Sequence, residues 1–304
     1  MIAALVVLPL ALRVPTSLAL RVPSLLHSSF HSAPQHCALP ISNRRAVVTA
    51  AAACFLMTAP TSAAPQPFAR MASEAASAFE KANYVECERL WRIATEAYPD
   101  QDIAWSNLAV ALIINASDDP AMKLGVAPSG VAKQRLEEAL TSISKAAELG
   151  STDSLTLNAQ GNALGLLLRW EEARAAYAAS TAVATRDFES IPRSNEALTL
   201  LELRQPEASE KLARRLLRRD PNFVDAQALL ATIKWSQRDA GGAAAEMSAL
   251  CDRPRDGQTW CERYSTADVV LGRWPPLAVS TYRDMLKDRS IQLVFKNSRA
   301  LPSR

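Results

Sequence analysis

Histidine, the side chain most often used as a catalytic base or metal ligand near neutral pH, occurs at only one end of this sequence. All three histidines, His27, His31 and His36, precede the first acidic residue, Glu74. Residues 74–304 therefore cannot support Ser-His-Asp or Cys-His catalysis, histidine-ligated zinc or a histidine pH switch. They also contain no glycine-rich phosphate loop and no cysteines at metal-ligand spacing. We expect no enzyme activity, no cofactor and no metal site.

The cysteines beyond the N-terminal segment suggest structural chemistry. Cys87 stands where a small buried residue is expected, so an inert thiol is favoured over a reactive one. Cys251 and Cys261 flank the turn-forming segment DRPRDGQTW. Their separation permits a disulfide if the compartment is oxidising. Two free thiols are the alternative.

Charge is distributed unevenly along the chain. Residues 1–73 carry five arginines and no acidic residue, so that 29 of the 34 basic and all 31 acidic side chains fall in residues 74–304. That part is slightly acidic, and the net charge of +3 belongs to the N-terminal segment. This distribution argues against a general nucleic-acid-binding protein.

The N-terminal segment has the composition of targeting sequences. Residues 1–19 resemble a signal peptide, and residues 20–43 are rich in Ser and Pro, lack acid and resemble a transit peptide. Arg44 and Arg45 then begin a second signal, residues 44–64, of the twin-arginine type. Two signals in series resemble the address of a protein of the chloroplast thylakoid lumen. The alternatives are secretion, another organelle, or an uncleaved membrane anchor at residues 46–59.

Small residues recur at intervals of 34 or 35 positions in the remaining sequence. Each is followed four residues later by a larger apolar residue, and in a helix these two positions share one face. This period predicts a repeated pair of helices with the small residue at a close helix contact. For the fourth repeat, Ser209 and Ala213 are the alternative pair. The predicted pairs are Cys87/Trp91, Ala139/Ile143, Ala173/Tyr177, Ala208/Leu212, Ala243/Met247 and Ala278/Tyr282, and the small residues of the preceding helices are Ala75, Ala109, Gly161, Ala197 and Ala231.

The repeats resemble the tetratricopeptide repeat (TPR). The resemblance is carried by Trp105 with Leu108-Ala109, by Gln160-Gly161, and most clearly by Trp170, Ala173 and Tyr177. It covers about residues 66–290 and is strongest to TPR proteins of the thylakoid lumen. It implies an all-α superhelical solenoid of about five to six helix-turn-helix repeats within residues 65–304. The last repeat, about 259–290, is degenerate, with Pro275 and Pro276 expected to begin its second helix.

An insertion interrupts the second repeat. Residues 115–131 are rich in Asp, Pro and Gly and are expected to form a loop between the two helices of that repeat. A surface excursion is the simpler interpretation, because long surface loops cost little. The alternative is a lip over a binding groove.

In the TPR family, ligands lie on the concave surface formed by the first helices, and the resemblance implies the same here. Exposed polar positions there could bind an extended peptide. Some TPR proteins bind the acidic tails of chaperones through a set of clamp residues, and only Asn107 matches that set here, so the clamp is absent. Trp235 could instead belong to the core between helices. The expected groove residues are Ser106, Asn107, Val110, Asn158, Asn162, Ser194, Leu198, Ala228, Thr232 and Trp235.

A basic band formed by Arg214, Arg215, Arg218 and Arg219 is expected on the opposite, convex face, where it is either solvated or docks an acidic partner. The sequence thus predicts a monomeric, non-catalytic scaffold with a protein or peptide partner, no nucleic acid and no membrane span in the mature form. The expected clients in the lumen are photosynthetic complexes under assembly or maintenance. The alternatives are a permanent structural subunit of a membrane-associated complex and a secreted or organellar TPR adaptor.

Overall fold

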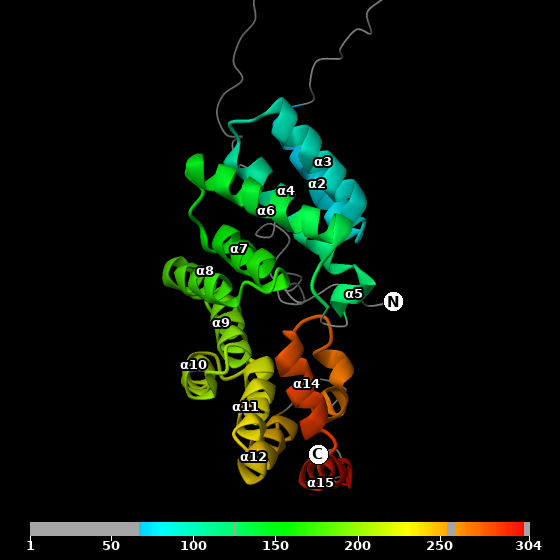
Figure 1. The fold of residues 1–304 in the computed structure, drawn as a ribbon, viewed down its shortest axis with the longest axis vertical. Coiled ribbons are helices and arrows are strands. Elements are labelled where there is room, and N and C mark those ends of the chain that lie inside the picture. Colours follow the sequence, from blue (N-terminus) through cyan, green and yellow to red (C-terminus); the bar gives the residue numbers. More distant parts are fainter. Residues whose placement is uncertain (1–66, 124–125, 254–259, 301–304) are drawn as a thin grey trace, which may run out of the picture.

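The computed structural model describes residues 67–123, 126–253 and 260–300, and these residues form helices and no strands (Figure 1). The predicted targeting segments 1–19, 20–43 and 44–64, with Arg44 and Arg45, lie outside the described residues. None of the described helices is long and apolar enough to cross a membrane.

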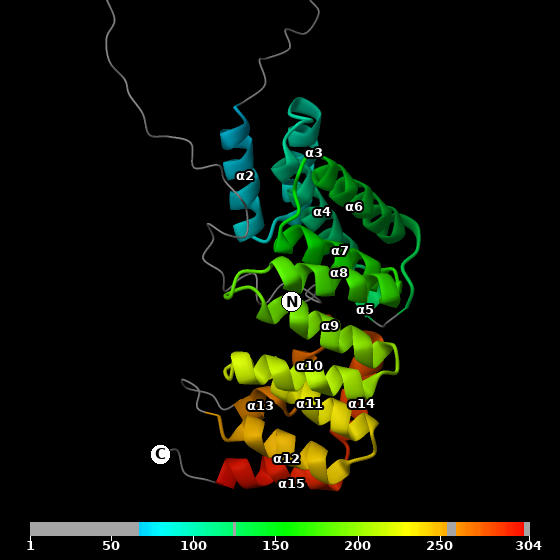
Figure 2. The ribbon, with the colours of Figure 1, turned by 90° about the vertical axis from the view of Figure 1, so that its left-hand side faces the viewer.

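Five helical pairs follow one another in the described part of the chain, as the period predicts. Each pair packs against the next, so that the helices stack as successive rungs (Figure 2). The all-α solenoid expected from the sequence is confirmed. The pairs are α2 (Phe68–Glu80) with α3 (Tyr84–Ala97), α4 (Asp102–Ser117) with α6 (Gly130–Glu148), α7 (Ser154–Leu166) with α8 (Trp170–Val183), α9 (Ser190–Glu202) with α10 (Pro206–Arg219), and α11 (Val224–Ser236) with α12 (Ala240–Cys251).

The turns between paired helices share one backbone conformation. A positive φ, between 55° and 63°, occurs two residues after the first helix of four of the pairs, at Ala82, Leu168, Arg204 and Arg238. A left-handed residue at this position ends a helix by redirecting the backbone, and glycine is the usual choice. Four non-glycine residues in one conformation show that the repeat geometry, rather than local preference, sets these turns.

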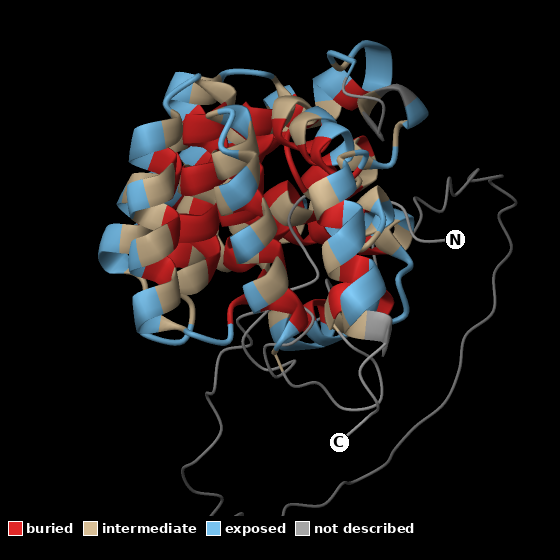
Figure 3. Cartoon of the chain, turned by 90° about the horizontal axis from the view of Figure 1, so that it is seen from below, coloured by how far each residue is buried: buried red, intermediate tan, exposed pale blue. Residues whose placement is uncertain are grey.

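The core follows the predicted small-and-large pairs, with one correction. Ala139, Ala173, Ala243 and Ala278 are completely buried, whereas Ala208 is exposed and Ser209 and Ala213 are buried in its place. The pair Ala208/Leu212 is therefore wrong by one residue. The reason is that Pro206 begins α10 and sets its phase, and the Ser209 hydroxyl donates a hydrogen bond of 2.6 Å to the Ala197 carbonyl. Figure 3 shows that buried residues gather where helices face one another.

Gly161 is the closest of these helix contacts. A β-carbon at this position would lie 2.5 Å from the ring of Tyr177, closer than packed atoms approach. The glycine on α7 therefore makes room for the aromatic ring on α8. The sequence prediction that Gly161 lies at a close helix contact is confirmed, and the structure identifies Tyr177 as the partner.

The insertion of repeat 2 begins later than the sequence suggests. Helix α4 continues to Ser117, and Asn115 donates a hydrogen bond of 3.0 Å to the Tyr84 carbonyl. The excursion then contains the short helix α5 (Pro120–Lys123) before α6 begins at Gly130. In Figures 1 and 2, α5 lies close to the C-terminal part of the chain.

The chain after repeat 5 does not add a sixth regular pair. It forms α13 (Trp260–Tyr264), the 3₁₀ turn η2 (Ala267–Val269), α14 (Pro276–Met285) and α15 (Arg289–Ala300). Pro275 and Pro276 begin α14, as expected. Helix α15 packs against α12 and continues the stack, whereas α14 packs on α9 and α11, the first helices of repeats 4 and 5 (Figures 1 and 2).

Candidate protein-binding pocket

Helix α14 covers the groove face of repeats 4 and 5. Glu202 on α9 accepts a hydrogen bond of 2.9 Å from the backbone N–H of Ala278, at the start of α14. Trp235 on α11 donates its indole N–H to Asp284 of α14 over 3.3 Å. Contacts from both first helices therefore hold α14 across the face that was expected to bind a ligand.

A buried ion pair fixes the segment that precedes α14. The guanidinium of Arg273 donates two hydrogen bonds to the Asp225 carboxylate, at 3.0 and 2.5 Å, and the Tyr264 hydroxyl donates a third at 2.5 Å. Burial, and then the negative charge of Asp225, raise the pKa of Tyr264. Bidentate pairs of this kind are strong and geometrically specific, so the segment is tied to the start of α11.

This arrangement corrects the predicted groove in repeat 5. Thr232 and Ala228 are completely buried, and the Thr232 hydroxyl donates to the carbonyl of Ala228 in its own helix. Trp235 is half-buried beside α14 and lines a shallow depression with Asp284 and Ser280. These residues cannot form an open groove because the C-terminal segment occupies the space in front of them.

Repeats 3 and 4 keep a half-open pocket with a cavity volume of about 200 Å³. Its walls come from four parts of the chain: the insertion of repeat 2, helices α7 and α8, helix α9, and residues 271–283. In Figures 1 and 2, α14 lies beside α9, and α5 lies near the C-terminal segment. The lining residues are Met122, Val126, Asn162, Gly165, Leu166, Leu168, Trp170, Tyr177, Asn195, Leu198, Thr199, Leu271, Gly272, Arg273, Trp274, Pro275, Pro276, Val279, Ser280 and Arg283.

The polar groups of this pocket are held by hydrogen bonds between helices. The Tyr177 hydroxyl donates to the Asn162 side-chain oxygen over 2.8 Å, and the Asn195 amide donates to Asn158 over 3.1 Å. Burial raises the pKa of Tyr177, so its phenol stays neutral. The described lining residues include two arginines and no carboxylate, and because Arg273 is paired with Asp225, the unpaired positive charge is that of Arg283.

The predicted groove residues of repeats 3 and 4 are only partly where they were expected. Asn158, Asn162, Ser194 and Leu198 are all more than nine-tenths buried and are not exposed groove positions. The structure brings Asn162 and Leu198 together in the pocket, while Asn158 lies behind Asn195. The two asparagines are held between helices, Asn162 by Tyr177 of its own repeat and Asn158 by Asn195 of the next repeat.

The predicted residues of repeat 2 do not join this pocket. Ser106 donates to the Ile103 carbonyl of its own helix, and Val110 is half-buried against the core. Asn107 is buried, and its amide nitrogen has no hydrogen-bond partner among the described residues. The face of α4 is thus separate from the site between repeats 3 and 4.

The predicted basic band is partly neutralised. Arg214 pairs with Glu210 at 2.9 Å and with Glu246 at 3.2 Å, and Arg219 pairs with Glu189. Arg215 and Arg218 are exposed. Exposed pairs of this kind add little stability, and the band is no continuous positive surface.

Many residues of the pocket that the sequence did not identify lie outside the regular repeats. Trp274, Pro275 and Arg283 belong to the degenerate last repeat, and Val126 belongs to the insertion. The apolar Trp-Pro-Pro run in a predicted turn was the available signal, because turns rarely need such residues. Its packing partners could not be inferred from position in the repeat.

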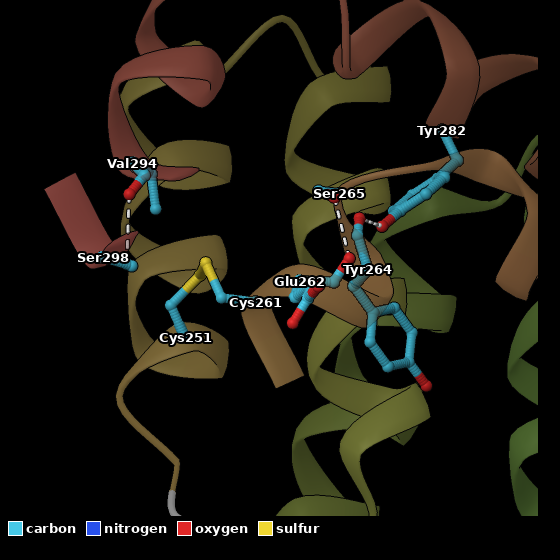
Figure 4. The surroundings of a disulfide bond; sticks show 8 residues. All are labelled: Cys251, Cys261, Glu262, Tyr264, Ser265, Tyr282, Val294 and Ser298. Atoms are coloured by element: carbon cyan, nitrogen blue, oxygen red, sulfur yellow. Dashed lines mark hydrogen bonds between the residues drawn. A yellow bond between two sulfur atoms is a disulfide. The ribbon is translucent and has the colours of Figure 1, made fainter. Parts of the chain in front are cut away.

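The structure joins Cys251 of α12 and Cys261 of α13 in a disulfide, with their α-carbons 4.3 Å apart (Figure 4). The bond attaches the first helix of the C-terminal segment to the end of repeat 5. Cys87 is a buried free thiol, as expected, and burial raises its pKa to about 12. Within the described residues, no group of three or more His, Cys, Asp or Glu is arranged to hold a metal ion.

Comparison with known proteins yields structural neighbours only. No family model matches the sequence, and no curated protein is found to be similar. Two solved structures with similar folds are those of PilF from Pseudomonas aeruginosa and of PilW, described as a widely conserved type IV pilus biogenesis factor. Both are 17% identical, with TM-scores of 0.48 and 0.49, covering 77% and 76% of this chain and 96% and 99% of theirs. A third is YrrB, described as a TPR protein with an unusual peptide-binding site, at 16% identity and a TM-score of 0.41, covering 69% of this chain and 98% of its own.

Proposed function

We propose that this protein is a non-catalytic scaffold that binds another protein through the pocket between repeats 3 and 4. The observation that carries the proposal is a half-open, largely apolar pocket lined together by the insertion of repeat 2, helices α7, α8 and α9, and residues 271–283. Concave apolar sites with a few convergent polar groups are the usual form of binding sites.

The rim of the pocket favours a protein ligand. Val126 and Leu168 are 55% and 40% exposed, and both line the pocket. Large apolar residues exposed around a concavity mark interaction sites, because a monomer gains nothing by leaving them in water. The lining contributes no carboxylate, and its phenol is neutral, so nothing among these side chains is suited to general acid or base chemistry.

For the compartment, we propose the thylakoid lumen, with photosynthetic complexes or their assembly intermediates as clients. Two signal-like segments in series around a transit-like segment support this address. The Cys251–Cys261 disulfide is compatible with an oxidising compartment. Fractionation of plastids that express the Arg44→Lys/Arg45→Lys variant tests this address. We expect an unprocessed intermediate outside the lumen, and normal maturation would show that the arginine pair is incidental.

Site-specific photo-crosslinking tests the scaffold function. A benzoylphenylalanine placed at Leu168, on the pocket rim, should form a discrete adduct with one protein in plastid extract. The matched control places the same residue at Val183, which is similarly exposed at the end of α8 and lies outside the pocket. Equal adducts at both positions, or adducts at Val183 alone, would refute binding at the pocket.

A further inference from the structure

The residues that line the pocket range from exposed at its rim to buried at its floor. Leu168, Ser280 and Arg283 are exposed and form the rim, whereas Asn162 is only 3% exposed and lies at the floor. Leu168 and Asn162 belong to the same end of repeat 3, about one and a half turns apart in sequence. A ligand group must therefore pass this rim before it meets the amides of Asn162 and Asn195.

The floor offers both a donor and an acceptor. Asn162 uses its side-chain oxygen for Tyr177, and Asn195 uses its side-chain nitrogen for Asn158. The Asn162 amide nitrogen and the Asn195 amide oxygen form no hydrogen bond with the described residues, and both side chains line the pocket. Polar groups at the end of an apolar pocket select ligands that can satisfy them, because an unsatisfied buried group is costly.

The walls between rim and floor suit an aromatic ring. Trp170 is half-buried, and its ring packs closely against Gly165, since a β-carbon there would lie 3.3 Å from the Trp170 ring. Trp274 is held in place by an edge-to-face contact with Tyr282, at a centroid distance of 5.5 Å. Rigid aromatic and proline surfaces bind rings well because they lose little conformational freedom.

Charge at the rim favours an acidic neighbour of that ring. Arg283 is exposed and has no ion pair among the described residues, whereas Arg273 is fixed on Asp225 outside the pocket. No carboxylate lines the pocket to compete for Arg283. A partner carboxylate at this height would be attracted, with the modest strength of an exposed ion pair.

On the premise that the proposed scaffold function is correct, we propose that the pocket takes a tyrosine side chain followed by an acidic residue in the partner protein. The ring lies along Trp170, the hydroxyl donates to Asn195 and accepts from Asn162, and the acidic side chain meets Arg283. The covering of repeats 4 and 5 by α14 means that a peptide enters the pocket with one side chain rather than running along the whole groove.

Labelled peptides titrated into the full chain test this proposal by fluorescence anisotropy. The reference is a capped Ser-Gly-Tyr-Glu-Gly-Ser peptide. We expect replacement of its tyrosine by alanine to weaken binding about 10- to 100-fold, and replacement by phenylalanine about 3- to 10-fold, because the floor amides lose their partner. Replacing its glutamate by glutamine should weaken binding about 2- to 5-fold, and added salt should remove this difference.

Variants of the protein locate the binding. Arg283→Ala should reproduce the loss seen with the glutamine peptide, while Arg215→Ala, an exposed arginine on α10, should bind as the unmodified protein does. Ser280→Trp, which places a large side chain at the rim, should abolish binding without lowering thermal stability, because Ser280 is exposed.

Several outcomes would overturn the proposal. They are equal affinity for the tyrosine and phenylalanine peptides, insensitivity to Ser280→Trp, and binding of free N-acetyltyrosinamide as tightly as the peptide, which would indicate a small-molecule site. If these peptides fail while crosslinking at Leu168 still captures a protein, the tyrosine proposal falls and the scaffold function stands. If neither is observed, both fall.

Discussion

Repeats 3 and 5 present equivalent first helices to the concave side of the solenoid, but only repeat 3 leaves its face open. On α7, Asn162 lines the pocket, whereas the equivalent residue of α11, Thr232, is completely buried. The difference does not come from the repeats themselves. It comes from α14, which returns from beyond repeat 5 and lies across α11 and α9. In this molecule, the path of the chain after the last repeat decides whether a groove position is left open to a partner or is covered by the chain's own end.

Removal of the Asp225 carboxylate should have the largest effect on stability, because this carboxylate holds the C-terminal segment that covers repeat 5. In Asp225→Ala the buried guanidinium of Arg273 loses its partner, and an unpaired buried charge typically costs about 3–5 kcal/mol. We expect chemical denaturation to show a destabilisation near the lower end, since both side chains keep some exposure. Asp268→Ala, on the exposed surface of η2, should change stability little. Similar stability of the two variants would mean that the pair does not fix the C-terminal segment.

The disulfide should contribute the next largest effect. Joint replacement of Cys251 and Cys261 by serine removes a crosslink with a sequence separation of 10, which loop-closure entropy values at about 2–3 kcal/mol. Reductant should lower the melting temperature of the unmodified protein about as far as the double replacement does, and it should not change the melting temperature of the double variant. Cys87 cannot account for the effect, because it is buried and unpaired. An equal response of both proteins to reductant would contradict a crosslink at this position.

Gly161→Ala tests the packing that shapes the open repeat. The new β-carbon would lie 2.5 Å from the Tyr177 ring, and overpacking of this kind costs about 1–3 kcal/mol. Gly241→Ala is the matched control, because it is also helical and has only Asp239 near its β-carbon, at 3.9 Å. The control should be neutral or slightly stabilised, since alanine favours helix over glycine. Equal melting temperatures for the two variants would show that the α7–α8 contact is placed wrongly.

A pH dependence should mark the contact between α9 and α14. Burial raises the pKa of Glu202 in the folded protein above its ordinary value, although the N–H of Ala278 opposes the shift. A carboxyl group with a raised folded pKa costs no stability below its ordinary pKa and begins to cost stability as pH rises above it. Glu202→Gln should therefore gain stability relative to the unmodified protein between pH 4 and pH 7. A constant difference across this range would contradict the burial of a charged Glu202.

The smallest effect is expected on the convex face. Reversal of Arg215 and Arg218 to glutamate should change stability by less than about 0.5 kcal/mol, because both side chains are exposed. Adduct formation at Leu168 should also be unchanged. Loss of the adduct in this variant would move the binding surface to the convex side.

The repeat period was sufficient to predict the solenoid, and its limits are visible at particular residues. The spacing placed Gly161 at a close helix contact, but it did not identify Tyr177 as the side chain that fills the space. For α10 the period left two registers open, and the structure adopts the alternative pair, Ser209 and Ala213, because the helix begins at Pro206 and its start rather than the period sets which side chain faces inward.

The pocket could not be predicted because its walls are joined by contacts over long sequence separations. Glu202 meets Ala278 across 76 residues and Arg273 meets Asp225 across 48. Asn158 and Asn162 were expected to be exposed because polar residues at groove positions usually bind ligands. The structure instead uses the side-chain oxygen of each as an acceptor between helices, which no single-repeat pattern reveals.

Hydrogen exchange measured by mass spectrometry on the complex with the crosslinked partner tests the central claim most directly. The claim is that repeats 3 and 4 bind the partner while α14 stays in place over repeat 5. We predict slower exchange in the end of α7, in α9 and in residues 271–283 on binding, with α11 unchanged. Faster exchange in α14 together with new protection of α11 would show that the partner displaces the C-terminal segment, and would contradict the account.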